Sequence, residues 1–332
     1  MTLAINTWND LDDNAQNALL ERPALANEGG IRSQVKSILS AVRNEGDDPI
    51  RRLTLDFDGV QLDTLRVTQA EFDDARQQLD DVAIEAIKLA IANVRRFHEQ
   101  QVPRPISVET MPGVVCERVS HALDAVGLYV PAGSAPLPSA AIMLAVPADI
   151  AGCPLRILCT PPRPDGTADP AVLVASAMAN ITEVYKIGGA QAIAAMAYGT
   201  ASVPKVRKIF GPGNAWVTGA KTMVSADSKG AAIDMPAGPS EVLVIADDGA
   251  NAGFVAADLL SQAEHGRDSQ VLLITTSESL ASGVQREVED QLQSLSRQDI
   301  ARESIANSTI IVVDSVRKAV AISNRYAPEH LI

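Results

Sequence analysis

The sequence predicts an α/β protein with two doubly wound, Rossmann-like lobes built on parallel sheets, preceded by an N-terminal helical segment. Short apolar runs alternate with helical segments from Val126 onward, which indicates repeated β-α units. Hydrophobic residues make up 46% of the chain and aromatic residues only 3%, a composition typical of aliphatic side chains packed between helices and parallel strands. The chain has 332 residues, more than one hydrophobic core normally holds, so two lobes are expected.

An arm and a helical segment precede the first lobe. We expect residues 1–26 to form an N-terminal arm and residues 27–107 to form a helical segment that packs with the second lobe. Charged and apolar residues mix at helical spacing over residues 31–101, and Asp80 to Arg96 carries an apolar stripe opposite a charged face. His98 belongs to this charged face and is expected to be solvated.

Two groups of β-α units define the lobes, the first over residues 125–235 and the second over residues 240–332. The Pro/Gly-rich stretch Asp234 to Ser240 separates them and is expected to act as a hinge. The two lobes share a rhythm of elements and no short sequence repeat. The strands expected in the first lobe are Val126–Val130, Arg156–Thr160, Glu183–Ile187 and Val206–Phe210, and those in the second are Glu241–Ala246, Gln270–Thr275 and Thr309–Val313.

The charge balance argues against two classes of partner. The net charge is −13, which repels a nucleic-acid backbone and an anionic membrane surface. The longest apolar stretch, near residues 140–150, is too short to span a bilayer, and Met1 to Asn14 lacks the features of a secretory signal, so a cytoplasmic protein is expected. The cysteines lack metal-binding spacing and are interpreted as buried thiols: Cys116, Cys153 and Cys159.

Three strand-to-helix junctions of the first lobe are rich in glycine and proline. Glycine lets a ligand approach the backbone, and the following helix N-terminus favours phosphate. All three are expected at the carboxyl edge of a parallel sheet, where open α/β folds bind ligands, so together they favour a nucleotide-like ligand. Each alone is also what any α/β loop needs, and the GxGxxG fingerprint is absent. The junctions are Pro131–Pro136, Gly188–Gln191 and Gly211–Asn214.

Asp258, Gln262 and His265 stand at i, i+4 and i+7, on one face of a predicted helix. A Gln carbonyl oxygen and an imidazole nitrogen on consecutive turns can address one cation. A lone His at a helix end is more often a capping or surface residue. Two ligands also leave an ion unsatisfied, so further Asp or His ligands would have to come from elsewhere.

Glu329 and His330 follow Pro328, which disfavours helix for the residue before it and places the pair at a helix-to-strand junction. A carboxylate beside an imidazole supplies a base with a pKa near physiological pH and a second group that can activate water. The alternative is a surface dipeptide. Adjacent strand residues point to opposite faces, so the catalytic interpretation requires the backbone to bend there.

Several motifs, taken together, closely resemble the histidinol dehydrogenase family. The resemblance covers nearly the whole chain, and its later motifs are highly specific. They are Gly127 to Gly133 (GLYVPAG), Ile209 to Ala215 (IFGPGNA), Asp234 to Glu241 (DMPAGPSE), Asp258 to Gly266 (DLLSQAEHG) and Pro328 to Leu331 (PEHL).

This resemblance implies oxidation of L-histidinol through the aldehyde to L-histidine, the end of histidine biosynthesis, with two NAD used in succession, one zinc ion and a homodimer. It implies that Gln262 and His265 are zinc ligands and substrate contacts, that Ser240 contacts substrate, and that His330 does so as well. Glu329 and His330 would be the catalytic pair. The NAD contacts would be Tyr129, Gln191 and Asn214.

The sequence departs from the family pattern in two places. Ala132 stands where many relatives have a second glycine. Relatives also continue past Ile332, and that stretch carries an Asp and a His zinc ligand, so we expect a truncated chain with a second lobe cut short and little or no activity. A zinc-dependent hydrolase, with Glu329 as base, and a non-catalytic binding or oligomerisation fragment remain as alternatives.

Overall fold

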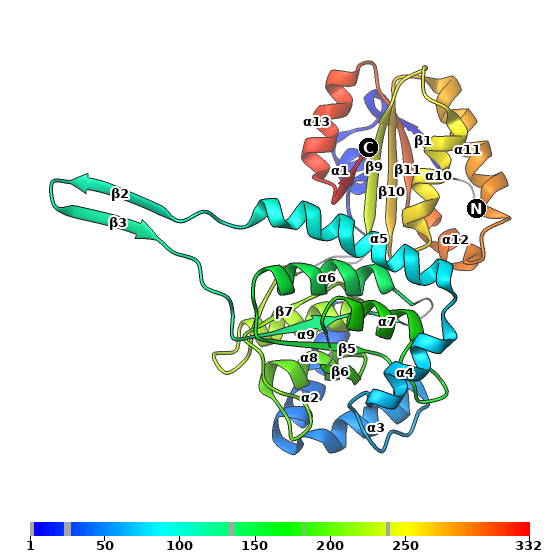
Figure 1. Cartoon of the computed structure of the whole chain (residues 1–332). Helices are drawn as coiled ribbons and strands as arrows, with labels where there is room; N and C mark the ends of the chain where they lie inside the picture. The colour runs from blue at the N-terminus through cyan, green and yellow to red at the C-terminus, as the bar shows by residue number, and fades with distance from the viewer. Residues whose placement is uncertain (1–2, 23–27, 133–135, 182, 237–239) are drawn as a thin grey trace. The chain divides into compact units, whose positions relative to one another are not determined.

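The computed structural model divides the chain into two compact units, one for each predicted lobe (Figure 1). The first-lobe unit is Gly29–Ala237, and the second-lobe unit combines Met1–Glu28 with Gly238–Ile332. Both contain a mainly parallel sheet flanked by helices, so the predicted α/β class is confirmed. The structure describes residues 3–22, 28–132, 136–181, 183–236 and 240–332, which leaves part of the expected hinge, residues 237–239, outside the described residues.

The sheet of the first-lobe unit has five parallel strands in the order β6-β5-β4-β7-β8. The chain therefore begins in the middle, moves outward to β6 and then crosses to the other side, so that β4 and β7 flank the point where the strand order reverses. The strands are β4 (Ala125–Tyr129), β5 (Leu155–Thr160), β6 (Glu183–Lys186), β7 (Lys208–Phe210) and β8 (Ala232–Ile233).

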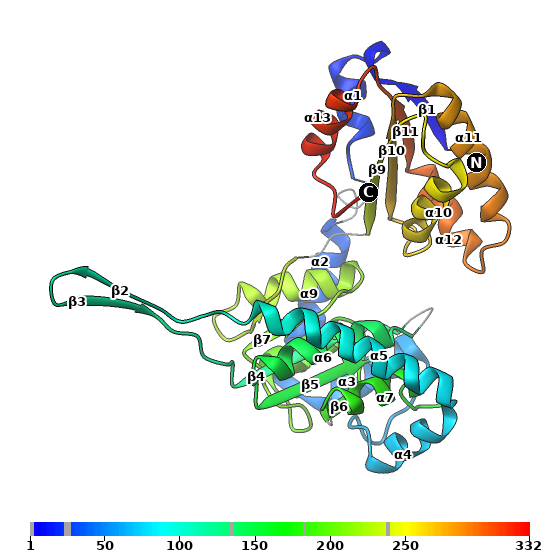
Figure 2. The same cartoon turned by 45° about the horizontal axis from the view of Figure 1, so that its top comes forward.

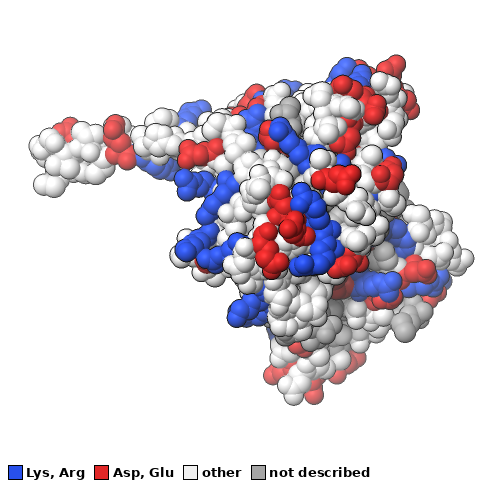
Figure 3. All heavy atoms as spheres, turned by 90° about the horizontal axis from the view of Figure 1, so that it is seen from below, with Lys and Arg blue, Asp and Glu red and all other residues white. Residues whose placement is uncertain are grey.

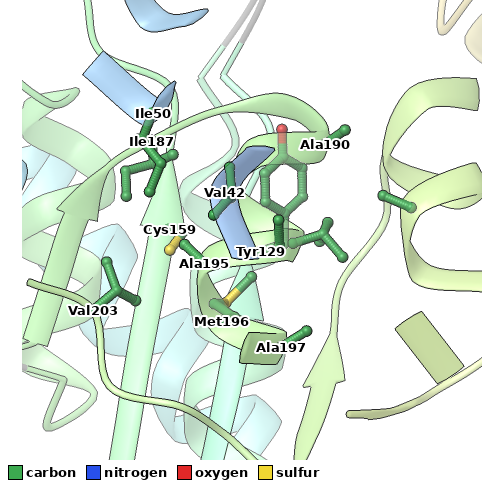
Figure 4. Close-up of a cluster of buried hydrophobic side chains, with 14 of the residues drawn as sticks. Val42, Ile50, Tyr129, Cys159, Ile187, Ala190, Ala195, Met196, Ala197 and Val203 are labelled. Carbon is green, nitrogen blue, oxygen red and sulfur yellow. The ribbon is translucent and has the colours of Figure 1, made fainter. Parts of the chain in front are cut away.

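Helices cover both faces of this sheet, with a separate apolar cluster under each layer. One cluster joins the sheet to α2, α3, α8 and α9, and part of it, including Tyr129, Cys159 and Met196, is drawn in Figure 4. The other cluster lies under α4 to α7. The bounds are α2 (Glu28–Glu45), α3 (Asp47–Asp58), α4 (Gln69–Gln78), α5 (Asp81–His98), a 3₁₀ turn Glu99–Gln101, α6 (Pro138–Ile150), α7 (Pro170–Met178), α8 (Gly189–Tyr198) and α9 (Ala215–Ser225).

The helical segment before the first lobe belongs to a different unit from the one we expected. We assigned residues 27–107 to the second lobe, but α2 to α5 share their apolar clusters with the first-lobe sheet and its helices. An apolar stripe on a helix shows that the helix is packed and does not show which sheet it packs on. His98, at the end of α5, is half-buried and its ring lies edge-on to Phe97.

The sheet of the second-lobe unit has the order β1-β11-β10-β9-β12, with every neighbouring pair parallel (Figure 2). The N-terminal arm supplies its first strand. Helices α10 to α12 share one apolar cluster with the sheet, and α13 shares another. The bounds are β1 (Ala4–Thr7), a 3₁₀ turn Trp8–Asp10, α1 (Asp13–Leu19), β9 (Glu241–Ala246), α10 (Ala252–Ala263), β10 (Gln270–Thr275), α11 (Glu278–Leu292), α12 (Gln298–Ala306), β11 (Thr309–Val312), α13 (Val316–Tyr326) and β12 (His330–Leu331).

An antiparallel hairpin of β2 (Ile106–Met111) and β3 (Val114–Arg118) follows α5, and every residue of both strands is exposed. Cys116 lies on β3, so the expectation of three buried thiols is wrong for Cys116 and correct for Cys153 and Cys159. Ile106 and Val108 alternate with polar residues along β2, as in a strand with one buried face, but the hairpin pairs with no other strand in the part of the chain that the structure describes.

Charged side chains are mixed on the molecular surface. On the face drawn in Figure 3, Lys and Arg lie among Asp and Glu and form no continuous basic patch. None of the described helices combines the length and the apolar character needed to cross a membrane.

Candidate functional site

The loop after β7 lies against the end of β4, at the point where the strand order of the first-lobe sheet reverses. Gly211 has a φ of +126°, and a Cβ atom at this position would lie 2.2 Å from the carbonyl oxygen of Tyr129. This close approach requires glycine. Asn214 then caps α9, because its side-chain oxygen accepts hydrogen bonds from the backbone N–H groups of Trp216 and Val217 at 3.1 and 3.2 Å. Its side-chain NH₂ group is left for another partner.

A buried ion pair holds the Gly211 loop from behind. Lys221 of α9 is 1% exposed, forms an ion pair with Asp234 and donates a hydrogen bond to the Gly211 carbonyl oxygen at 2.7 Å. The Asp234 carboxylate accepts the N–H of Gly211 at 2.8 Å. Both backbone polar groups of Gly211 are therefore fixed by charged side chains, and this charge-assisted arrangement is stronger than neutral hydrogen bonds.

Tyr129 and Gln191 meet at the N-terminus of α8. The Tyr129 hydroxyl accepts the backbone N–H of Gly189 at 3.0 Å, and burial raises the pKa of Tyr129 to about 12. Gln191 is 2% exposed, and its side-chain oxygen finds no hydrogen-bond partner among the described residues. A buried orphan acceptor is costly, so this atom fits a site for a polar ligand. The first of the three Gly/Pro-rich junctions, Pro131–Pro136, lies partly outside the described residues, at 133–135.

Gln262 and His265 lie at the C-terminal end of α10. The helix ends at Ala263, so His265 stands in the following turn, two residues beyond the helix that we expected to contain it. The His265 Nδ1 atom lies 2.8 Å from the carbonyl oxygen of Ser261 and must donate, because a carbonyl only accepts. This leaves Nε2, for which the described residues supply no hydrogen bond, to face a ligand, as it does in a metal-binding histidine.

The side-chain oxygen of Gln262 is buried and has no hydrogen-bond partner in the described structure. An orphan oxygen three residues before a free imidazole nitrogen suits a cation such as Zn²⁺, which binds both atom types. The residues present therefore fit a metal, although they supply two donors. In the described ranges, no group of three or more His, Cys, Asp and Glu side chains is arranged to hold a metal ion.

Glu329 follows the end of α13 and His330 is the first residue of the edge strand β12, so the pair lies at the helix-to-strand junction that we predicted. The His330 Nδ1 atom is 3.1 Å from the backbone carbonyl oxygen of Glu241 and 3.8 Å from a carboxylate oxygen of Glu329. The two side chains therefore lie on the same side, as the catalytic interpretation required. Ala327 produces the bend: it ends α13 in a left-handed conformation with φ +52°, in keeping with the expectation that Pro328 disfavours helix for the residue before it.

All the second-lobe candidates lie at the edge of the sheet where its strands begin. Ser240 immediately precedes β9, and His330 pairs with Val242, the second residue of that strand. Helix α10 leaves the other end of β9 and runs back to the start of the parallel strand β10, which brings Gln262 and His265 to the same edge. Asp258, on α10, has no metal-binding partner group in the described structure.

A model of the histidinol dehydrogenase family matches residues 20–332. The histidinol dehydrogenase of Aliivibrio fischeri is 54% identical over 325 residues, which cover 98% of this chain and 73% of the relative. This chain belongs to the histidinol dehydrogenase family. That of Xanthomonas axonopodis is 54% identical over 330 residues, 99% of this chain and 76% of the relative. The crystal structure of the Elizabethkingia anophelis histidinol dehydrogenase aligns with a TM-score of 0.92 at 44% identity, covering 99% of this chain and 75% of that one.

Residues that the sequence motifs did not single out also surround these candidates. Asp58, at the end of α3, has a pKa raised by burial, and one of its carboxylate oxygens lacks a described partner. Lys221, which holds the Gly211 loop, is a further example. No periodicity or motif marks these residues, because their importance depends on contacts between distant segments.

Proposed function

We propose that this protein is a histidinol dehydrogenase, which oxidises L-histidinol through the aldehyde to L-histidine with two NAD. Family membership over residues 20–332 is the observation that carries the proposal. The orphan oxygens of Gln191 and Gln262 support it, since each lies where the proposal needs a polar contact. Neither a hydrolase nor a non-catalytic fragment has a specific observation in its favour.

The NAD side of the proposed site is the carboxyl edge of the first-lobe sheet. Tyr129, Gln191 and Asn214 would contact the cofactor, around the N-termini of α8 and α9. Helix N-termini attract the negative charge of a pyrophosphate. The Lys221–Asp234 pair would keep the Gly211 loop in the shape that receives the cofactor.

The zinc ligands in this chain would be Gln262 Oε1 and His265 Nε2, with the remaining ligands supplied by other residues. Ser240, Gln262, His265 and His330 would contact the substrate. When bound, zinc would grip the amine and imidazole of the substrate, and nicotinamide would accept hydride. The C-terminal end of α10 carries partial negative charge, which favours a cation at this position.

His330 would act as the general base. Its Nδ1–H is engaged by the Glu241 carbonyl oxygen, which leaves Nε2 to take the alcohol proton in the first oxidation. In the second oxidation Glu329 would help a water molecule add to the aldehyde, so that the carbon that loses hydride is a hydrated one. The side chains are 49% and 53% exposed, so protons can exchange with solvent.

The test is a steady-state assay that counts NADH formed for each histidinol consumed. From the sequence we expected little or no activity, but family membership over residues 20–332 does not support that expectation, and we now expect two NADH for one histidinol, whereas a hydrolase forms none. Glu329→Gln should slow aldehyde oxidation far more than alcohol oxidation, because only the second step needs water. His330→Asn should impair both steps. An equal loss in both steps for Glu329→Gln, or an intact alcohol step in His330→Asn, would contradict the assigned roles.

We also propose that the enzyme is a homodimer, as the family resemblance implies, and that it is cytoplasmic, as we expected from its sequence. Light scattering on the purified protein, and fractionation of the cells that express it, test these two properties separately.

A further inference from the structure

Arg22 of the N-terminal arm contacts the start of β9 and the C-terminal end of α13 in the second-lobe unit. Its Nε and Nη2 atoms donate to the two carboxylate oxygens of Glu241, at the start of β9, at 2.8 and 2.9 Å. Nη2 also donates to the carbonyl oxygens of Tyr326 and Ala327 at 2.8 and 3.1 Å, and the guanidinium carbon lies 4.4 Å from the centre of the Tyr326 ring. A planar fork of donors is needed for this set of contacts, which a lysine ammonium cannot reproduce.

Tyr326 completes the cluster from the end of α13. It is 2% exposed, and its hydroxyl donates to the Glu241 carboxylate at 2.6 Å and lies 2.9 Å from the side-chain oxygen of Gln270. The Gln270 amide nitrogen donates to the carbonyl oxygens of Glu21 and Asn307, which fixes the orientation of its amide. The Glu241 carboxylate is therefore held by a guanidinium and a phenol, and its side chain is 12% exposed.

This cluster is connected to the Glu329–His330 pair through the backbone of Glu241 and of Ala327. The Glu241 side chain is held by Arg22, and the Glu241 carbonyl oxygen accepts the Nδ1–H of His330. Ala327 stands two residues before Glu329, and its left-handed conformation is unfavourable for a residue with a Cβ atom. The hydrogen bond from Arg22 to the Ala327 carbonyl oxygen fixes this bend.

We propose that Arg22 is a positioning residue for the catalytic pair, which it controls through Glu241 and through the carbonyl groups of Tyr326 and Ala327. Among the described residues, Arg22 has no hydrogen bond to Glu329 or His330, so it would act on the pair only through these neighbours. It fixes Glu241 at the start of β9, and the Glu241 carbonyl oxygen selects the Nδ1–H tautomer of His330. It also fixes the bend at Ala327, which directs Glu329. The inference rests on the proposed function for the roles of Glu329 and His330, whereas the tautomer of His330 can be measured independently of activity.

The experiment compares Arg22→Lys and Tyr326→Phe with Arg325→Lys. Arg325 is a matched control, because it also ties the N-terminal arm to α13, through Asn17 and the Trp8 ring, but it has no contact with Glu241 or Ala327 in the described structure. The chain has four histidines, so the imidazole nitrogen resonances of His330 can be assigned by comparison with His330→Asn. Nitrogen chemical shifts then report its tautomer, and Trp8 fluorescence reports whether the unit is folded.

In Arg22→Lys we expect a mixture of His330 tautomers and a fall in kcat of about 10- to 100-fold, since small misplacements of catalytic groups have effects of that size. The KM values for histidinol and NAD should change little. Tyr326→Phe should give a smaller change in the same direction, which keeps the proposal testable if Arg22→Lys does not fold. Arg325→Lys should change neither the tautomer nor kcat.

An unchanged His330 tautomer in both Arg22→Lys and Tyr326→Phe would overturn the proposal. An equal effect of Arg325→Lys would also overturn it, because it would show a general loosening of the arm. Failure of the proposed function would give a different pair of results. The His330→Asn variant would keep its alcohol oxidation, whereas the His330 tautomer would still change in the Arg22→Lys variant.

Discussion

Replacing Lys221 with Met should destabilise the first-lobe unit, because it removes one partner of a buried ion pair. Met keeps most of the side-chain volume but leaves the Asp234 charge and the Gly211 carbonyl oxygen without their partner. Breaking a buried pair costs about 3–5 kcal/mol. The Asp234 side chain is 26% exposed and can recover some hydration, so we expect a loss of about 3 kcal/mol, at the lower end of this range.

The assay is urea unfolding followed by tryptophan fluorescence. The chain has two tryptophans, and a Trp8→Phe background leaves Trp216 of α9 as the reporter of the first-lobe unit. With a slope of about 3 kcal/mol per molar urea, the midpoint should fall by about 1 M. The control is Lys205→Met, since exposed Lys205 also donates to a carbonyl oxygen at 2.8 Å but has no carboxylate partner within ion-pair distance in the described structure. A similar, small shift in both variants would refute this reasoning.

Two further predictions concern pH. Burial raises the pKa of every tyrosine in the chain. The folded protein should therefore show little tyrosinate absorbance at pH 10, the normal pKa of the phenol, whereas half of the tyrosines should be ionised in urea-unfolded protein. Because the folded pKa values are higher than the unfolded ones, the contribution of the tyrosines to stability is present below pH 10 and is lost as the pH rises through the folded pKa values. A tyrosine that ionises normally in the folded state would contradict this prediction for that residue, the four being Tyr129, Tyr185, Tyr198 and Tyr326. Burial alone would raise the pKa of Asp149, but the hydrogen bonds from Arg95 and Asn180 and the charge of Arg156 lower that pKa overall. The contribution of Asp149 to stability is therefore present above pH 3.8 and is lost as the pH falls through the pKa of the folded state. Asp149→Asn should therefore cost about 1 kcal/mol at neutral pH, with a deficit that shrinks in acid unfolding curves; a deficit independent of pH would point to packing instead.

The sequence predicted most of the fold because the central strands of both lobes are continuous apolar runs. The expected strands Glu241–Ala246 and Gln270–Thr275 agree with β9 and β10 at both ends. One element that pattern reading missed has a pairing partner far along the chain. Strand β1 reads as a polar arm and is a strand because it pairs with β11, more than 300 residues away. The unit to which α2 to α5 belong is likewise a tertiary choice that an amphipathic stripe leaves open.

The candidate site was predictable where a motif combines residue types that chemistry needs. Helical spacing placed Gln262 and His265 on one face, and only the family resemblance made them zinc ligands; the structure adds an oxygen of Gln262 and a ring nitrogen of His265 without described hydrogen-bond partners. The Glu329–His330 pair required a bend that the sequence only allowed, and Ala327 supplies it with a left-handed conformation. The residues behind the site could not be predicted. Arg22 lies 219 positions before its partner Glu241, and no local pattern connects them.

The two lobes place their candidate sites at opposite edges of similar sheets, and the helix dipole gives a physical reason. In a β-α-β unit the helix begins at the carboxyl edge of the sheet and ends at the amino edge. The carboxyl edge of the first-lobe sheet therefore gathers the N-termini of α8 and α9, where partial positive charge suits the phosphates of a dinucleotide. The amino edge of the second-lobe sheet gathers the C-terminus of α10, where partial negative charge suits a metal ion and a substrate ammonium group. One repeated architecture can thus serve an anionic cofactor and a cationic centre, because in the proposed sites each lobe would use the edge whose backbone charge matches its ligand.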